Sequence, residues 1–311
     1  MKSVALLASV GFATPFLSAQ TSRTALPGTV NYVEGQVSIN GNPLNSRQDG
    51  TAQVQPNQSL MTANGKAEML LSPGVFVRQG NNSEVRLVSP GLVDPTIEVV
   101  RGEAMVEVDQ KLKDNRIDVR EHGIVTSILK NGLYRFDSDN GRVEVIDGQV
   151  RVNENGQSKE LGRGKEVMLN GQPLKTVSFD RKAEDDLYQW SSVRSQYLAE
   201  ANMATAQNIY MGYGPYWGTG WYWSPYYAAW SWLPGDGFFY SPFGYPFFSP
   251  AYIVYAPRFG RFGYRTGGAF AAGRSFAGRA GVNMAPRLSG GGFHGGGFHG
   301  GGGFHGGGGR R

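Results

Sequence analysis

Apolar and polar residues alternate along most of the chain between residues 28 and 177, a pattern typical of β-strands with one face in a core. Turn signals interrupt the alternation roughly every eight to twelve residues. Asn64-Gly65, Asn131-Gly132 and Asn155-Gly156 are three of them, and both residue types tolerate positive φ. No window shows a clear helical period. The pattern predicts one all-β domain over residues 28–177, with about a dozen strands.

One short phrase occurs three times in this region. Residues 33–39 are Val-Glu-Gly-Gln-Val-Ser-Ile, residues 146–152 are Ile-Asp-Gly-Gln-Val-Arg-Val, and residues 100–106 are a looser copy. A glycine inside a strand pattern marks a bulge, a bend or a close backbone approach. We therefore expect Gly35, Gly102 and Gly148 at equivalent corners of stacked β-layers. A twisted solenoid and a sandwich both fit, and the repeat favours the solenoid-like form.

The ordered set of motifs resembles the FecR domain over roughly residues 28–170. The matching positions are Gly28, Val30, Val33-Glu34-Gly35 and Val37; Leu60, Thr62, Ala67 and Leu70; Val100-Arg101-Gly102-Glu103-Ala104; Val143, Val145, Gly148 and Val150; and Leu161 and Gly164. In the best-known members, this domain is the periplasmic part of a membrane regulator that relays siderophore occupancy of an outer-membrane receptor to a sigma factor. Here Gly132-Leu133 stands where the family usually has Gly-Thr, and no membrane helix precedes the domain. The resemblance implies the fold and an envelope location.

The first residues have the three parts of a secretory signal. Lys2 is the positive region, residues 4–16 are apolar or small, and Leu17-Ser18-Ala19 offers a cleavage site. We expect a signal peptide over residues 1–19, with cleavage before Gln20. The apolar run is shorter than the roughly 20 residues of a membrane helix, and Pro and Gly interrupt the later ones. The sequence thus predicts an exported bacterial protein, periplasmic or at the cell surface, with no transmembrane helix in the mature chain.

Residues 178–208 change to helical spacing. Leu187, Trp190, Val193 or Arg194, Tyr197, Leu198 and Ala201 fall on one face. This predicts an amphipathic helix over about 180–205 with Asp180 as N-cap, and its apolar stripe should pack on the β-domain. Binding of a partner by Trp190 and Tyr197 is the alternative.

Residues 209–257 are rich in aromatic residues, Pro and Gly. Three stretches alternate, at residues 220–223, 229–233 and 237–240, and turn signals separate them. They predict a small three-stranded aromatic meander or clip, with disordered low complexity as the alternative. Exposed rings in such a piece would form an interaction site and could stack on sugars.

Charge divides the chain in two. Residues 1–208 hold 22 basic and 24 acidic residues, a net charge of −2, whereas residues 209–311 hold eight arginines and only Asp236, a net charge of +7. The Arg-Phe-Gly and Gly repeats of residues 258–311 cannot bury a core, and disorder is expected there. The tail could self-associate or bind an anionic envelope polymer, and nucleic acid is not expected for an exported chain. The repeated Gly-Gly-Phe-His-Gly places His294, His299 and His305 in a metal-capture pattern, a weaker alternative.

The sequence contains no recognisable set of catalytic residues. The chain has no cysteine, which excludes disulfides, thiolate metal sites, a cysteine nucleophile and a lipoprotein anchor. His122, the only histidine before the tail, lies in a predicted hairpin tip, and no Gly-x-Ser-x-Gly elbow occurs. Asp185-Asp186 falls on a solvated helix start. We predict no catalytic, cofactor or metal residues. We expect a non-enzymatic envelope interaction or signalling module that binds a protein or polymer partner, such as a polysaccharide or anionic polymer, through the FecR-like β-domain and the aromatic tail; a self-assembling surface matrix protein is the alternative.

Overall fold

The computed structural model describes residues 25–169, 173–181 and 184–256. The predicted signal peptide, the tail from residue 257 onward and its three histidines lie outside this part. The described residues belong to one structural unit.

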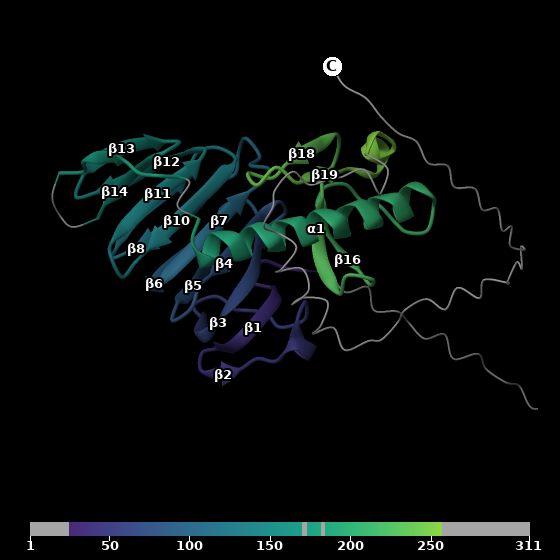
Figure 1. Ribbon diagram of the computed structural model, residues 1–311, viewed down its shortest axis with the longest axis horizontal. Helices are drawn as coiled ribbons and strands as arrows, with labels where there is room; N and C mark the ends of the chain where they lie inside the picture. Colours follow the sequence, from purple (N-terminus) through teal and green to yellow (C-terminus); the bar gives the residue numbers. More distant parts are fainter. Residues whose placement is uncertain (1–24, 170–172, 182–183, 257–311) are drawn as a thin grey trace, which may run out of the picture. The chain divides into compact units, whose positions relative to one another are not determined.

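Fifteen strands form the main sheet (Figure 1). They are β1 (Val30–Ile39), β2 (Asn42–Pro43), β3 (Ser59–Ser72), β4 (Val75–Gln79), β5 (Glu84–Ser89), β6 (Thr96–Arg101), β7 (Glu103–Val108), β8 (Ile117–Glu121), β9 (Ile124–Ile128), β10 (Gly132–Asp137), β11 (Arg142–Asp147), β12 (Gln149–Glu154), β13 (Gln157–Gly162), β14 (Lys165–Met168) and β15 (Thr176–Ser178), with a short 3-10 helix η1 (Ser46–Gln48). The chain continues through α1 (Asp186–Tyr210), β16 (Gly220–Ser224), β17 (Ala229–Leu233), β18 (Phe238–Tyr240), β19 (Pro246–Phe248) and η2 (Pro250–Tyr255).

The long strand β3 belongs to both halves of the main sheet. Its first residues pair with β5, which continues through β6, β8, β9, β12 and β13; we call these strands the first half. Its last residues pair with β4, which continues through β7, β10, β11, β14 and β15, the second half. Apolar residues from both halves share one core, among them Val85, Val99 and Val119 from the first and Val77, Val106 and Val145 from the second. The predicted all-β fold is confirmed, and this shared core makes it sandwich-like.

Two of the three repeated glycines lie where the chain passes from one half to the other. Gly102 joins β6 to β7 and Gly148 joins β11 to β12, and in each case the two strands lie in opposite halves. Gly35 lies inside β1, next to a register shift against β3. Their φ angles are +72° (Gly35), +68° (Gly102) and +95° (Gly148), which L-residues with side chains rarely adopt. The expectation that the phrase marks corners is therefore confirmed for Gly102 and Gly148, whereas Gly35 lies within a strand.

Two strands of the second half, β4 and β10, are buried on both faces. Every residue of β4 and β10 is buried, so the half-buried strands that the alternation predicts are wrong here. The inward face carries the shared core. The outward face carries Leu70 and Phe76, which pack with Leu198 of α1 and with Trp221 and Trp232 of the aromatic segment. In Figure 1, α1 runs across β4 and β7. The helix and the aromatic strands therefore form a further layer on the sheet, as expected for the helix stripe.

The helix begins six residues later than the predicted N-cap Asp180. Its N-cap is Asp185, whose carboxylate accepts a 2.8 Å hydrogen bond from the backbone N–H of Tyr188. The prediction was wrong because the chain is still held at the sheet at this point: the N–H of Phe179 donates to Gly164 at 3.4 Å. Asp185 also pairs with Arg135 of β10 at 2.7 Å, which fixes the helix start on the second half.

The aromatic segment folds into two hairpins, β16–β17 and β18–β19, rather than the predicted three-stranded meander. Side chains occupy the edge of β17 that a third strand would need. The Asn31 amide accepts from the N–H of Trp230 at 2.9 Å and donates to its carbonyl at 3.0 Å. The Asn202 amide donates to the carbonyls of Trp232 and Phe248 at 2.9 and 3.0 Å. Two asparagines therefore replace a strand, and β18 pairs with β19 instead.

The corner glycines make a testable prediction. A Cβ on Gly148 would overlap the Tyr134 hydroxyl and the Asn131 carbonyl, whereas a Cβ on Gly156, also at positive φ, would meet nothing within 4 Å. We expect Gly148→Ala to lower the free energy of unfolding by about 3 kcal/mol or more, and Gly156→Ala by about 1 kcal/mol from backbone strain alone. Urea denaturation measures both, and equal losses would show that Gly148 is not a packed corner.

Candidate functional site

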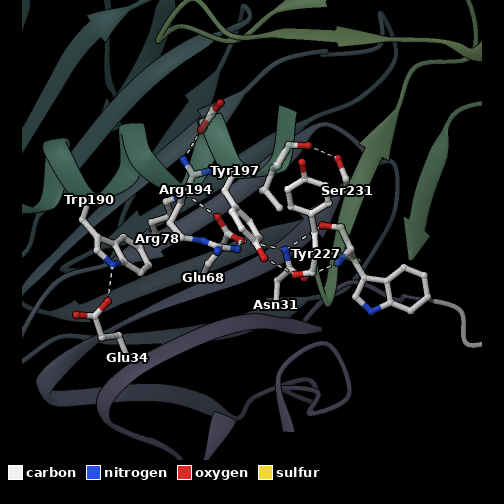
Figure 2. A network of polar contacts seen from close by, with 12 residues as sticks. Asn31, Glu34, Glu68, Arg78, Trp190, Arg194, Tyr197, Tyr227 and Ser231 are labelled. Atoms are coloured by element: carbon white, nitrogen blue, oxygen red, sulfur yellow. Dashed lines mark hydrogen bonds and ion pairs between the residues drawn. The ribbon is translucent and has the colours of Figure 1, made fainter. Parts of the chain in front are cut away.

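Four charged residues meet between the sheet and α1, and we call them the buried charge network: Glu68, Arg78, Glu107 and Arg194. Glu68 and Arg78 face each other across β3 and β4, and the Arg78 Nε donates to Glu68 at 2.8 Å. The other end of the Arg78 guanidinium pairs with Glu107 of β7. Arg194 reaches down from α1, and its Nη2 donates to Glu68 at 2.8 Å. Figure 2 shows Glu68 between the two arginines.

The network is enclosed and its charges balance. All four residues are at most 1% exposed, with two positive and two negative charges. Burial alone works to raise the pKa of Glu68, but Arg194 and Arg78 outweigh it and lower this pKa to about 2. Burial opposes the charge of Arg78, while Glu107 and Glu68 raise its pKa. Glu68 and Arg78 therefore stay ionised at physiological pH.

Neighbouring residues of α1 and β1 complete the contact. The Ser195 hydroxyl donates to Glu107 at 2.7 Å, and the Asn31 amide donates to Glu68 at 2.9 Å. The Arg194 guanidinium lies over the Tyr32 ring, 4.3 Å from its centroid. Arg194 and Ser195 of α1 thus both meet carboxylates of the sheet.

The two helix residues considered for partner binding are used inside the protein. Trp190 is buried, and its indole N–H donates to Glu34 at 3.1 Å. Tyr197 is half-buried and donates its hydroxyl to the carbonyl of Tyr227 at 2.6 Å. Figure 2 shows both side chains directed at these partners. Trp190 and Tyr197 therefore hold the helix in place, and the alternative role is wrong for the structure described.

Two further carboxyl groups border the network. Burial, and after it the nearby Glu107, raise the pKa of Asp109 well above its usual range. Burial also raises the pKa of Asp49 to about 7, although Arg194 works in the opposite direction. Asp49 therefore gains and loses its proton near neutral pH, within the electrostatic reach of Arg194 and Glu68.

Stability and specificity come from different residues in this layer. Removing ionised groups from water costs several kcal/mol each, so buried ion pairs contribute little net stability. The apolar partners supply it, because truncating a buried Trp or Phe costs about 3–5 kcal/mol. The largest of them are Phe76, Trp221, Trp230, Trp232 and Phe247, all buried. The ion pairs decide where the helix lies, since a misplaced helix would leave a charge unpaired.

The only Ser–His contact among the described residues is unsuited to catalysis. His122 lies in the turn between β8 and β9, as expected, and its Nε2 lies 2.7 Å from the carbonyl of Ser138. The Ser138 hydroxyl is 3.4 Å from this nitrogen and 3.3 Å from the carbonyl of Val100, and the residue is buried. A nucleophile must reach its substrate, and the buried Ser138 hydroxyl cannot.

The paired carboxylates at the helix start, Asp185 and Asp186, form ion pairs with Arg135 and Lys66.

Glu121 is a buried acid that the sequence places in a hairpin tip. It follows Ile117 and Val119 on the same face of β8, and that face carries the core. Neither carboxylate oxygen has a hydrogen-bond partner. Burial, aided by Asp137, raises the pKa of Glu121 to about 9, so the side chain is neutral at physiological pH.

A group of exposed aromatic side chains lies where α1 ends. We call it the aromatic end: Tyr210, Tyr213, Tyr216, Trp217 and Tyr255. Tyr216 and Trp217 both stack on Tyr222 of β16, with centroid distances of 5.9 and 5.5 Å. Tyr222 packs with Ile209 of α1 and Ile253 of η2, so the three segments meet here. Trp217 remains 67% exposed and Tyr213 79% exposed. This is a group of outward rings on a packed base, as the sequence analysis expects of this segment.

Comparisons with known proteins leave the chain without a family. No protein-family profile matches it, and no curated protein matches it. Two crystal structures of a "putative anti-sigma factor" from Parabacteroides distasonis are similar to it at 13% identity, each with a TM-score of 0.34. The similarity covers 43% of this chain and 63% of the first structure, and 50% and 73% for the second. This chain thus spans less than two thirds of the first. Similarity at this level assigns neither a family nor a function.

Among the described residues no cluster of His, Asp or Glu is suited to a metal ion, and none of the helices there is long and apolar enough to cross a membrane. His294, His299 and His305 lie outside this part. What the structure adds is the buried charge network, which the sequence analysis did not identify. The available signal was Arg194 itself, the one basic residue in residues 186–256, on the face of the apolar stripe.

The first prediction from this site concerns Arg194. Arg194→Met leaves Glu68 and Glu107 with one arginine, so we expect a loss of about 3–5 kcal/mol in the free energy of unfolding. Adding Glu68→Gln restores the balance and should recover part of the loss. Arg151→Met is the matched control: its 2.6 Å ion pair with Glu160 is about half exposed, and the expected loss is at most about 1 kcal/mol. Similar losses for the two single variants in urea denaturation would contradict a network held by Arg194.

The second prediction concerns pH. Glu121 keeps its proton in the native state up to a pKa of about 9, whereas the unfolded chain releases it near 4.5. Between these values the unfolded state binds fewer protons, so this group makes stability fall as pH rises, by at most about 1.4 kcal/mol per pH unit. Glu121→Gln cannot ionise, and its advantage over the unmodified protein should grow from pH 5 to pH 9. Glu160→Gln, at an exposed site, should show a flat difference; a flat difference for Glu121→Gln would refute a buried neutral acid.

Proposed function

We propose that the protein is a non-enzymatic binding module of the cell envelope and that its ligand site is the aromatic end. The observation that carries the proposal is Trp217: one ring face stacks on Tyr222 and the other is open to solvent. Exposed aromatic groups of this kind are typical of interaction sites, because leaving large rings in water is unfavourable.

The rings are held before any ligand arrives. The backbone N–H of Trp217 donates to the Tyr222 hydroxyl at 3.0 Å, and that hydroxyl donates to the carbonyl of Gly218 at 2.9 Å. The Tyr216 hydroxyl shares its one proton between the carbonyls of Pro234 and Gly235, at 2.7 and 2.6 Å. A preformed site loses little conformational entropy on binding, which favours affinity.

The chemistry of the aromatic end suits a neutral polysaccharide. Flat rings pack against the apolar C–H faces of sugar rings, and tyrosine hydroxyls can exchange hydrogen bonds with sugar hydroxyls. Residues 195–256, which supply all the rings of this surface, contain no Lys, Arg or His that would favour an anionic polymer. The basic residues that could bind such a polymer lie in the tail, outside the described residues.

The envelope location rests on the sequence. The signal-peptide pattern of residues 1–19 and the resemblance of residues 28–170 to the FecR domain both support it. In this proposal the β-domain is the scaffold. Its buried charge network positions α1, and the end of α1 positions the rings.

The test is binding of neutral oligosaccharides to the full mature chain. We expect β-linked glucose or N-acetylglucosamine hexasaccharides to bind in isothermal titration calorimetry, and Trp217→Ala to weaken binding by about tenfold or more, equivalent to about 1.4 kcal/mol. Tyr226→Ala is the matched control, since Tyr226 is 89% exposed in the turn at the opposite end of the β16–β17 hairpin.

Two outcomes would overturn the proposal. One is that neither hexasaccharide binds, and the other is that Trp217→Ala and Tyr226→Ala lose the same affinity. Binding of a uronic acid polymer with unchanged affinity in Trp217→Ala would instead assign ligand binding to the arginine-rich tail.

A further inference from the structure

The charged residue beside the aromatic end is an acid, Asp236. Asp236 is exposed and acts on the phenol of Tyr216, whose pKa is raised by burial first and then by Tyr222 and Asp236. None of the ion pairs within the described residues uses Asp236. Open ring faces beside an exposed carboxylate, without a basic residue in residues 195–256, are the chemistry that recognises a guanidinium group.

The chain carries such groups directly beyond this place. Ile253 of η2 packs beneath the aromatic end with Ile209 and Tyr222, and the described residues stop at Ala256, three residues later. The next residues are Arg258-Phe259-Gly260-Arg261-Phe262-Gly263-Tyr264-Arg265. They offer three arginines and three more rings and no acidic residue.

We propose that residues 258–265 of the same chain dock on the aromatic end and compete there with the ligand. Arginine side chains would lie over the faces of Trp217 and its neighbouring tyrosines, with Asp236 as the ionic partner. The short connection from η2 gives the segment a high effective concentration, which favours docking within one molecule over docking between molecules. The regulatory consequence rests on the proposed polysaccharide function, whereas the docking itself does not.

A charge-matched pair of variants separates this site from the general effect of a basic tail. In the first, Arg258, Arg261 and Arg265 are changed to Ser; in the second, Arg274, Arg279 and Arg287 are changed to Ser. Both are made in the full chain and remove the same charge. Docking is observed by 19F NMR of 5-fluorotryptophan, with the Trp217 signal assigned by its loss in Trp217→Phe. We expect the first variant, and not the second, to shift the Trp217 resonance.

Asp236→Asn should shift the same resonance in the same direction, because it removes the proposed ionic partner. The shift in the unmodified chain should be independent of protein concentration. A shift that appears only as concentration rises would show docking between copies and overturn the proposal, as would equal effects of the two triple variants.

Hexasaccharide affinity then tests the competition. We expect the first triple variant to bind about threefold more tightly or better than the unmodified chain, with the second unchanged. If no hexasaccharide binds but the Trp217 signal still reports docking, the proposed function fails and the docking stands. If hexasaccharides bind equally to all three proteins and the Trp217 signal is unchanged, the docking fails and the function stands.

Discussion

The ion pair between Arg194 and Glu68 is the constraint on which the rest of the structure depends. Arg194 is the only basic residue in α1, and it is buried against the outward face of the sheet. An unpaired buried charge costs several kcal/mol, so α1 is restricted to the one position in which Arg194 meets Glu68. That position also brings Ser195 to Glu107 and Trp190 to Glu34. The register of the helix is therefore set by charge, although its free energy of packing comes from rings and aliphatic groups.

The position of the helix determines the position of the aromatic strands. Asn202 lies eight residues after Arg194, and its side-chain amide forms hydrogen bonds with the backbones of both Trp232 and Phe248. Asn31 serves the same edge of β17 from the sheet, and its amide also bonds to Glu68 of the charge network. One network thus links β1, β3, α1 and β17. Its consequence is that the aromatic end has a rigid base, which a surface that binds through open ring faces requires.

Part of this organisation could be predicted from the sequence. The period of two predicted the β-strands, the repeated glycines predicted two of the corners, and helical spacing predicted α1 with each end within about six residues. The charge network could not be predicted this way. Glu68, Arg78 and Glu107 alternate with apolar neighbours as solvent-facing residues do, and alternation cannot distinguish a face in water from one covered by a distant helix. Asp180 and Asp185 are equally good N-caps by type, and only the contact of Asp185 with Arg135 selects one.

The pairing of the aromatic strands could not be predicted from sequence patterns either, because an asparagine side chain in place of a strand leaves no periodic signal.

The central claim is that α1 and the aromatic strands unfold together with the sheet. Native-state hydrogen exchange tests it most directly. The claim predicts that amides of Leu198 in α1 and Trp232 in β17 open with the same free energy as that of Val106 in β7. Opening of Leu198 and Trp232 at a much lower free energy, with Val106 still protected, would contradict it.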